Sequence, residues 1–312
     1  MEKSKVTVIV LTYNQENTIS RTIESILEQA TDFSYEILIG EDASTDNTRN
    51  IVKRYCKRYP DKIRLMPESP NKGVYRNSFE CLLESRSEYV SFCFGDDFYC
   101  NKKKLQYQLD YLEKHPSCVG IHSEMKHFDC RTKEIITPPL RSEVPEGNLD
   151  KIIFFEHIVF TPTLMFRRSA LSDEKLKELL KRSFSADDIV FLCYLAQQGD
   201  IHYTPKFDVV YSVGAETTCQ SSDFNKKFNF MWSVYSALEY IYNDLKPQYP
   251  KKILLRLKRY DLCRLVLSGK NIKTIIRHCK HLLTTELMGV IIDMVVHENK
   301  KRQKIFERYC NL

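Results

Sequence analysis

Apolar runs and segments of helical periodicity alternate along the first half of the chain. The run from Val6 to Leu11 is uninterrupted and rich in β-branched residues, which is typical of a strand buried on both faces. The segment Glu16–Gln29 then repeats its isoleucines at the spacing of a helix. This order predicts a mostly parallel sheet with helices on both faces. Further strands are predicted at Tyr35–Gly40, Lys62–Met66 and Glu88–Phe94, and further helices at Ser44–Tyr59 (with Ser44 or Thr45 as N-cap), Val74–Ser85 and Lys102–His115.

The pattern after residue 116 is more mixed. The predicted elements are strands at Cys118–Phe128 and Leu164–Arg167, helices at Leu171–Arg182 and Asp187–Gln198, short edge strands at His202–Thr204 and Val209–Val213, and a polar loop at Thr132–Asn148. After Asp223 the pattern is almost wholly helical. We therefore predict an α/β domain over residues 1–220, with halves 1–115 and 116–220, followed by a helical region over 221–312.

Composition excludes several classes of protein. The 312 residues are 43% apolar and 28% charged, close to globular averages and unlike disordered or collagen-like chains. The nine glycines form neither GxGxxG nor a P-loop, so the usual phosphate-binding loops are absent. No apolar run approaches the roughly 18 residues of a membrane-spanning helix, and the apolar stretch near the N-terminus is too short for a signal peptide. The 11 cysteines form no CxxC pair, which indicates reduced core thiols of a cytosolic protein.

Charge is uneven along the chain. The net charge is +6, yet residues 225–312 hold 18 Lys and Arg against 7 Asp and Glu. Between residues 251 and 265, basic side chains alternate with leucines, a pattern typical of an amphipathic helix on an anionic membrane surface. A helix packed on its own domain would show the same pattern, so both interpretations stay open. Nucleic acid is not indicated, because the basic and aromatic residues match no recognition pattern.

Polar side chains follow three predicted strands at the point where each ends. In an open parallel sheet the carboxyl ends of the strands meet at one edge, and ligands bind there. We therefore expect one site formed by Thr12, Tyr13 and Asn14 after the first strand, Asp42 after the second, and Asp96 and Asp97 after the strand Glu88–Phe94.

The residue types at this edge suggest a nucleotide and a metal ion. Adjacent carboxylates such as Asp96 and Asp97 repel each other, and Mg²⁺ or Mn²⁺ neutralises them while binding phosphate oxygens. The ring of Tyr13 could stack on a base, and Asp42 could accept a hydrogen bond from a base or a ribose. The structural alternative is that the acids cap helices and the tyrosine lies at the rim of the core.

A second acidic pair, Asp187 and Asp188, opens a predicted helix after a polar loop. A carboxylate in this position can act as a general base when a partner or a substrate raises its pKa. The alternative is an ordinary acid that the dipole of the helix favours.

Together these residues resemble the family-2 glycosyltransferases, inverting enzymes with the GT-A fold. The resemblance covers about residues 4–215. It implies a GT-A sheet with a Rossmann-like nucleotide-binding half. The matching stretches, in the order and roughly the spacing of the family, are VTVIVLTYNQENTISRTIESILEQ, YEILIGEDASTDNTRNIV, NKGVYRN, YVSFCFGDDFY and FSADDIVFLCYLAQQGDIHYTP.

The resemblance also implies a role for each motif residue. Two departures concern the metal motif, which is GDD rather than a spaced DxD, and the stretch 213–217, which lacks the histidine of many relatives. Thr12 and Tyr13 would line the base pocket, and Asn14 would belong to the same donor site. Asp42 would hold the base or ribose, Asp96 would lie near the ribose, and Asp97 would coordinate the metal. Arg76 would approach a phosphate or be a plain surface residue. Asp188, with Asp187 as the second candidate, would be the catalytic base.

The function implied by the resemblance is transfer of a sugar from a nucleotide-diphosphate donor, most commonly UDP-linked, to a hydroxyl of a glycan or lipid-linked acceptor. The expected setting is cell-surface polysaccharide synthesis with Mn²⁺ or Mg²⁺, in the cytoplasm or peripherally at the inner face of the membrane. A nucleotidyltransferase that makes nucleotide sugars is disfavoured because no glycine or basic residue lies between the first strand and Arg21. A non-catalytic nucleotide- or glycan-binding relative is disfavoured by the acids at the strand ends.

Overall fold

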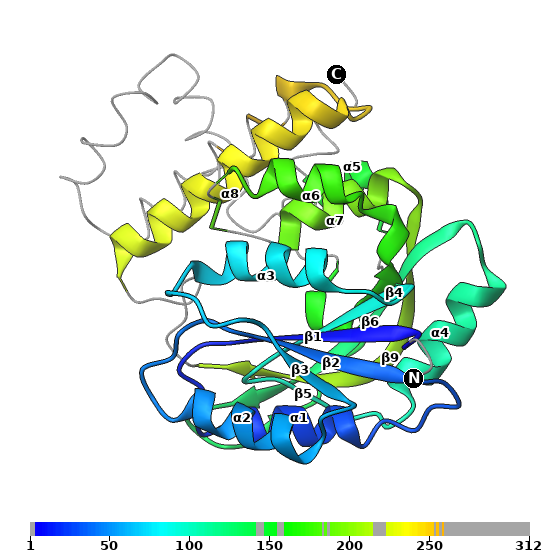
Figure 1. Ribbon diagram of the computed structural model, residues 1–312. Coiled ribbons are helices and arrows are strands. Elements are labelled where there is room, and N and C mark those ends of the chain that lie inside the picture. The colour runs from blue at the N-terminus through cyan, green and yellow to red at the C-terminus, as the bar shows by residue number, and fades with distance from the viewer. Residues whose placement is uncertain are drawn as a thin grey trace.

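The computed structural model describes residues 4–141, 147–154, 159–182, 184–185, 188–214, 223–252, 254–255 and 258. Within them a central sheet has the strand order β3-β2-β1-β4-β8-β6-β9-β5, and β7 pairs with β6 (Figure 1). The strands are β1 (Val6–Thr12), β2 (Tyr35–Glu41), β3 (Ile63–Leu65), β4 (Tyr89–Phe94), β5 (Phe98–Tyr99), β6 (Cys118–Asp129), β7 (Ile135–Ile136), β8 (Met165–Arg167) and β9 (Asp200–Val213). The helices are α1 (Ile19–Leu27), α2 (Thr48–Arg58), α3 (Gly73–Glu84), α4 (Lys104–Lys114), α5 (Leu149–Phe154), α6 (Asp173–Leu179), α7 (Asp188–Gln197) and α8 (Phe224–Leu245).

The first four strands form the predicted parallel sheet. β1 pairs in parallel with both β2 and β4, and β2 pairs in parallel with β3. Thr12 lies beside Glu41, and Leu11 lies beside Phe94, so these strands end at one edge of the sheet. The side chains along β1 are all buried, as its uninterrupted apolar run predicts.

The second half of the sheet is mixed. β8 is antiparallel to both β4 and β6, which it separates, whereas β6 and β9 are parallel. The prediction of two short edge strands was wrong, because residues 200–213 form the single strand β9 between β6 and β5. β9 contains a bulge, in which its residues 204–206 lie opposite the single residue Ser123 of β6. The bulge accommodates Pro205, which cannot donate a hydrogen bond to the neighbouring strand.

Two hydrophobic cores cover the two faces of the sheet. Side chains of α1, α2 and α4 form one, and side chains of α3 and α5–α8 form the other (Figure 1). Tyr235, Leu238 and Ile241 of α8 are fully buried in the second core. The first helix of the predicted C-terminal region thus packs against the α/β domain.

Helices α1, α2, α4 and α6 begin two to four residues later than the sequence pattern predicted, and side-chain contacts explain the start of two of them. α2 begins at Thr48 rather than Ser44, because Ser44 and Thr45 bond to Asn14 of a neighbouring loop instead of capping the helix. α6 begins after Ser172, whose hydroxyl accepts the backbone N–H of Lys175.

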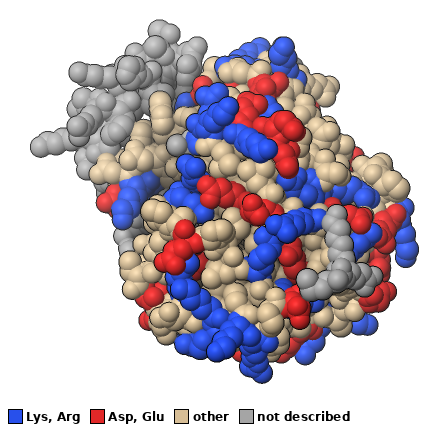
Figure 2. Space-filling view, viewed as in Figure 1, with Lys and Arg blue, Asp and Glu red and all other residues tan. Residues whose placement is uncertain are grey.

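The predicted basic helices beyond residue 258 lie outside the described residues. Nowhere in the described part does a helix have the length and apolarity needed to cross a bilayer. On the face drawn in Figure 2, basic and acidic side chains are interspersed.

Candidate functional site

The turn between β4 and β5 carries Asp96 and Asp97, and hydrogen bonds hold its backbone. The Thr22 hydroxyl on α1 donates to the carbonyl oxygens of Gly95 (3.0 Å) and Asp97 (2.6 Å). The Ser212 hydroxyl on β9 donates to the carbonyl oxygen of Asp96 (2.6 Å). The two carboxylates therefore project from a backbone that is fixed from both sides.

Asp97 is fully buried, and only one of its two carboxylate oxygens has a hydrogen-bond partner. Its Oδ1 accepts the backbone N–H of Ser212 (2.9 Å), whereas Oδ2 is buried without a hydrogen-bond partner. Burial raises the pKa of this carboxyl well above its usual value, and the neighbouring Asp96 raises it further. An ionised carboxylate with an unpartnered oxygen is costly in a protein interior, so the position suits a bound cation.

Asp96 lies beside the end of β1. Burial raises the pKa of its carboxyl, and a hydrogen bond from the Gln15 side chain opposes that shift. Thr12 Oγ1 in turn donates to Gln15 Oε1 (2.8 Å). A glycine is needed at position 95, because a Cβ there would lie 2.6 Å from Thr12 Oγ1. The first strand and the acidic turn are thus in direct contact.

Arg21 and Ser212 also contact the acidic turn, and neither was predicted from the sequence. The guanidinium of Arg21 lies 4.2 Å from the ring centre of Phe98 and 4.9 Å from that of Phe128, and its Nη2 donates to the carbonyl of Asp96 (3.3 Å). Ser212 is 115 residues away from Asp97 in sequence, so no local motif connects them. Ser212 reaches Asp97 only because β9 lies beside β5, and Arg21 reaches the turn only because α1 packs against it.

The acidic turn fits a divalent cation that is shared with a ligand. Among the described residues no cluster of three or more His, Cys, Asp or Glu side chains could hold a metal alone. Mg²⁺ is commonly held by one or two carboxylates, with phosphates and waters completing its coordination. Asp97, with Asp96 beside it, matches that pattern.

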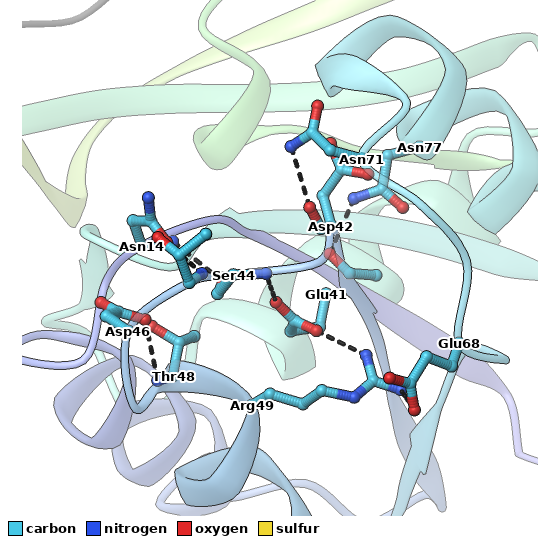
Figure 3. Close-up of polar contacts among 12 residues, drawn as sticks. Asn14, Glu41, Asp42, Ser44, Asp46, Thr48, Arg49, Glu68, Asn71 and Asn77 are labelled. Atoms are coloured by element: carbon cyan, nitrogen blue, oxygen red, sulfur yellow. Dashed lines mark hydrogen bonds and ion pairs between the residues drawn. The ribbon is translucent and has the colours of Figure 1, made fainter.

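Asp42 follows directly after β2 and caps the start of α3 (Figure 3). Its Oδ1 and Oδ2 accept the backbone N–H groups of Lys72 and Gly73, each at 2.9 Å, and Asn71 Nδ2 donates to its carbonyl oxygen (2.9 Å). Its backbone N–H donates to the carbonyl of Thr12 (3.0 Å). The helix-capping alternative is therefore present in the structure, and a base could use only the remaining lone pairs of this carboxylate.

Asn14 joins the loops that follow β1 and β2. It has a left-handed backbone (φ 53°), its N–H donates to Ser44 Oγ (2.9 Å), and its Oδ1 accepts the N–H of Thr45 (2.8 Å) (Figure 3). Tyr13 precedes it at the rim with 46% of its surface exposed. The ring of Tyr13 is therefore accessible to a ligand.

The remaining predicted residues lie on helices. Arg76 is an exposed residue of α3 and forms an ion pair with Glu80 (2.8 Å). Asp188 is the first residue of α7, is exposed, and its Oδ1 accepts the N–H of Ile189 (2.8 Å). Asp187 lies outside the described residues, as do residues 215–217 of the stretch without histidine.

The architecture is that of a GT-A glycosyltransferase. The crystal structure of Staphylococcus aureus TarS residues 1–349 in complex with UDP-GlcNAc matches with a TM-score of 0.59 at 20% identity, over 93% of this chain and 79% of that one. The mannosyltransferase PcManGT from Pyrobaculum calidifontis, in complex with GDP-Man and Mn²⁺, matches with a TM-score of 0.54 at 17% identity, over 96% and 88% of the two chains. At these identities the likeness shows the fold.

The family follows from the sequence comparison. The model of glycosyl transferase family 2 matches residues 7–200, and the chain belongs to this family. EpsE of Bacillus subtilis is 31% identical over 238 residues, which is 75% of this chain and 80% of EpsE. Rv1520 of Mycobacterium tuberculosis is 32% identical over 168 residues, 54% of this chain, and the match spans about half (48%) of that relative's length.

Proposed function

We propose that this protein transfers a sugar from a nucleotide-diphosphate donor to a hydroxyl of an acceptor in cell-surface polysaccharide synthesis. The observation that carries the proposal is the buried Asp97, with one oxygen held by Ser212 and the other without a partner. A carboxylate kept in this state at a strand end suits a metal ion that binds a diphosphate.

In this proposal each group of site residues has a role in binding or in the reaction. The exposed ring of Tyr13 and the buried Asp42 bind the base, and Asp96 lies near the ribose. Asp97 would hold Mn²⁺ or Mg²⁺, and the ion would supply positive charge to the departing diphosphate. Asp188, or Asp187 beside it, accepts the proton of the acceptor hydroxyl as its oxygen attacks the anomeric carbon. A single displacement inverts that carbon and needs no covalent intermediate.

Relatives support the acceptor class. Staphylococcus aureus TarS, by its name a poly(ribitol-phosphate) β-N-acetylglucosaminyltransferase, is 31% identical over 195 residues, covering 60% of this chain and 31% of TarS. Its crystal structure contains UDP-GlcNAc, which favours UDP as the first nucleotide to test. A polymer acceptor of the cell surface is the corresponding proposal for this chain.

Calorimetry with nucleotides tests the donor site. The protein is titrated with UDP, GDP, CDP and dTDP, with and without Mn²⁺, beside the Asp97→Ala variant. We expect one nucleotide to bind in a metal-dependent manner, and the variant to lose that dependence. Absence of nucleotide binding under every condition would contradict the proposal. The Asp188→Asn variant is then expected to bind the donor and to lose turnover by at least about a hundredfold.

The basic segment between residues 251 and 265 leads us to propose a peripheral membrane location on the cytoplasmic side. Flotation with anionic liposomes measures it. Binding that weakens as salt rises is expected, because the attraction is electrostatic. No difference between anionic and neutral liposomes would refute this location.

A further inference from the structure

A groove of about 760 Å³ opens beside the candidate donor site. One wall is the start of α3 with the residues before it, from Ser69 to Arg76. The opposite wall is the segment after α6, with Leu180, Arg182, Phe184 and Ser185. The first wall is held by Asp42, and the second continues in sequence to Asp188. The groove therefore borders Asp42 through its first wall, and its second wall ends three residues before Asp188 in sequence.

The second wall is fixed by contacts with α8 and α3. The backbone N–H of Ser185 donates to Ser233 Oγ on α8 (2.7 Å). The ring of Phe184 packs edge-on against Tyr75 of α3, with ring centres 5.9 Å apart. The guanidinium of Arg182 lies over the ring of Tyr240, 4.5 Å from its centre. This wall is thus a built surface with a positioned cation.

The groove carries an excess of positive charge. Lys72, Arg76 and Arg182 line it, and Glu80 is the one carboxylate among its described lining residues. Glu80 is shared by Lys72 (2.7 Å) and Arg76 (2.8 Å), so it cannot neutralise both. Arg76 and Arg182 are exposed to solvent. Two positive charges therefore remain available to a ligand, and arginine is well suited to bind phosphate.

We propose that this groove binds the acceptor and that the acceptor carries phosphate groups. This inference rests on the proposed function and adds the chemical class of the second substrate. An acceptor held here by its phosphates extends from the α3 wall toward Asp188. A neutral glycan would leave the excess positive charge of the groove unmatched by the ligand and would bind more weakly.

Binding of a short polyol phosphate tests the groove. Calorimetry compares a glycerol phosphate trimer with uncharged triglycerol on the full chain, and UDP with Mn²⁺ is titrated separately. We expect the trimer to bind at least about tenfold more tightly than triglycerol. Arg182→Gln is expected to weaken trimer binding about five- to tenfold. Arg182→Lys keeps the charge but loses the planar guanidinium, so it is expected to weaken binding less than Arg182→Gln does.

A matched control separates the groove from general charge effects. Arg58 on α2 is also an exposed arginine stacked on a tyrosine, Tyr59, at 5.2 Å from the ring centre. Arg58→Gln is expected to leave trimer binding unchanged. Three results would each overturn the proposal. The glycerol phosphate trimer and triglycerol could bind equally well, Arg182→Gln could leave trimer affinity unchanged, or Arg58→Gln could lower trimer affinity as much as Arg182→Gln does. A failure of the proposed donor site would show instead in the UDP titration of the unaltered protein.

Discussion

At the scale of single residues, the burial of Asp97 lowers the stability of the fold but prepares its carboxylate to bind a cation. Burial raises the pKa of its carboxyl above the unfolded value, so its favourable contribution to folding exists at low pH and is lost as pH rises through the folded pKa. Near neutral pH and without metal, the Asp97 carboxyl must either stay ionised in the protein interior or take up a proton. Both lower the stability of the folded state. A neutral side chain of the same shape removes this cost.

We therefore predict that Asp97→Asn raises the free energy of unfolding of the metal-free protein by about 1–3 kcal/mol at pH 7. The same variant should lose Mn²⁺-dependent nucleotide binding. Urea denaturation and calorimetry measure the two effects, with the exposed Asp61→Asn as control. A variant that is less stable than the unaltered protein would contradict the desolvation argument.

His122 gives a second prediction, on acid stability. It is fully buried on β6 with neither ring nitrogen hydrogen-bonded, and burial, with Arg141 nearby, lowers its pKa to about 3. Folding therefore favours neutral histidine, and this contribution is present above the unfolded pKa of about 6.5 and lost as pH falls toward 3.

Replacing this ring should flatten the acid side of the stability profile. Between pH 6 and 4 the unaltered protein should lose up to about 1.4 kcal/mol per pH unit more than His122→Phe. Urea denaturation at several pH values measures the slope. His115→Gln, at an exposed position, serves as control, and parallel slopes for His122→Phe and the unaltered protein would refute the assignment.

At the scale of elements, a polar stripe along α1 holds the acidic turn. Thr18 and Thr22 donate to carbonyls of the turn, Ser25 accepts the N–H of Tyr99, and Gln29 donates to the carbonyl of Asn101. The spacing of Thr18, Thr22 and Ser25 places them on one face of the helix, and Gln29 follows just after the helix ends. The helix thereby fixes the backbone from which Asp96 and Asp97 project.

Thr22→Val removes the hydroxyl at nearly constant volume. The carbonyl of Asp97 then loses its Thr22 donor, and we expect the free energy of unfolding to fall by about 1–3 kcal/mol. The affinity for Mn²⁺ with UDP should fall about tenfold, because outer partners of a metal ligand fix its geometry. Thr22→Ser should restore both quantities. An unchanged metal affinity in Thr22→Val would show that the turn holds its shape without α1.

The elements of the first half could be predicted because each has a local signal. The apolar run of β1 and the isoleucine period of α1 report burial directly. β9 could not be predicted as one strand, since Pro205 breaks its local pattern and only the bulge opposite β6 explains its continuity. The strand-end rule located Asp96 and Asp97, whereas Ser212 and Arg21 contact them through tertiary packing that no local pattern reports.

At the scale of the whole molecule, α8 and the α/β domain share one core. Leu238 of α8 is fully buried in that core. We predict that Leu238→Ala lowers the free energy of unfolding by about 2–5 kcal/mol in a single transition. Urea denaturation followed by fluorescence and circular dichroism tests it, with the exposed Asn229→Ala on the same helix as control. Two separate transitions, with only one affected, would indicate an independent C-terminal unit.

The position of β8 has a consequence for synthesis on the ribosome. Residues 6–94 already contain β1 to β4, so the parallel half can form while the rest of the chain is still being made. The outer edge of β4 then lies unpaired until residues 165–167 emerge and insert between β4 and β6. An open edge on a nascent sheet invites pairing with other chains. Slow translation between codons 95 and 165 should therefore favour aggregation, and synonymous changes there would alter the yield of soluble protein without altering the protein itself.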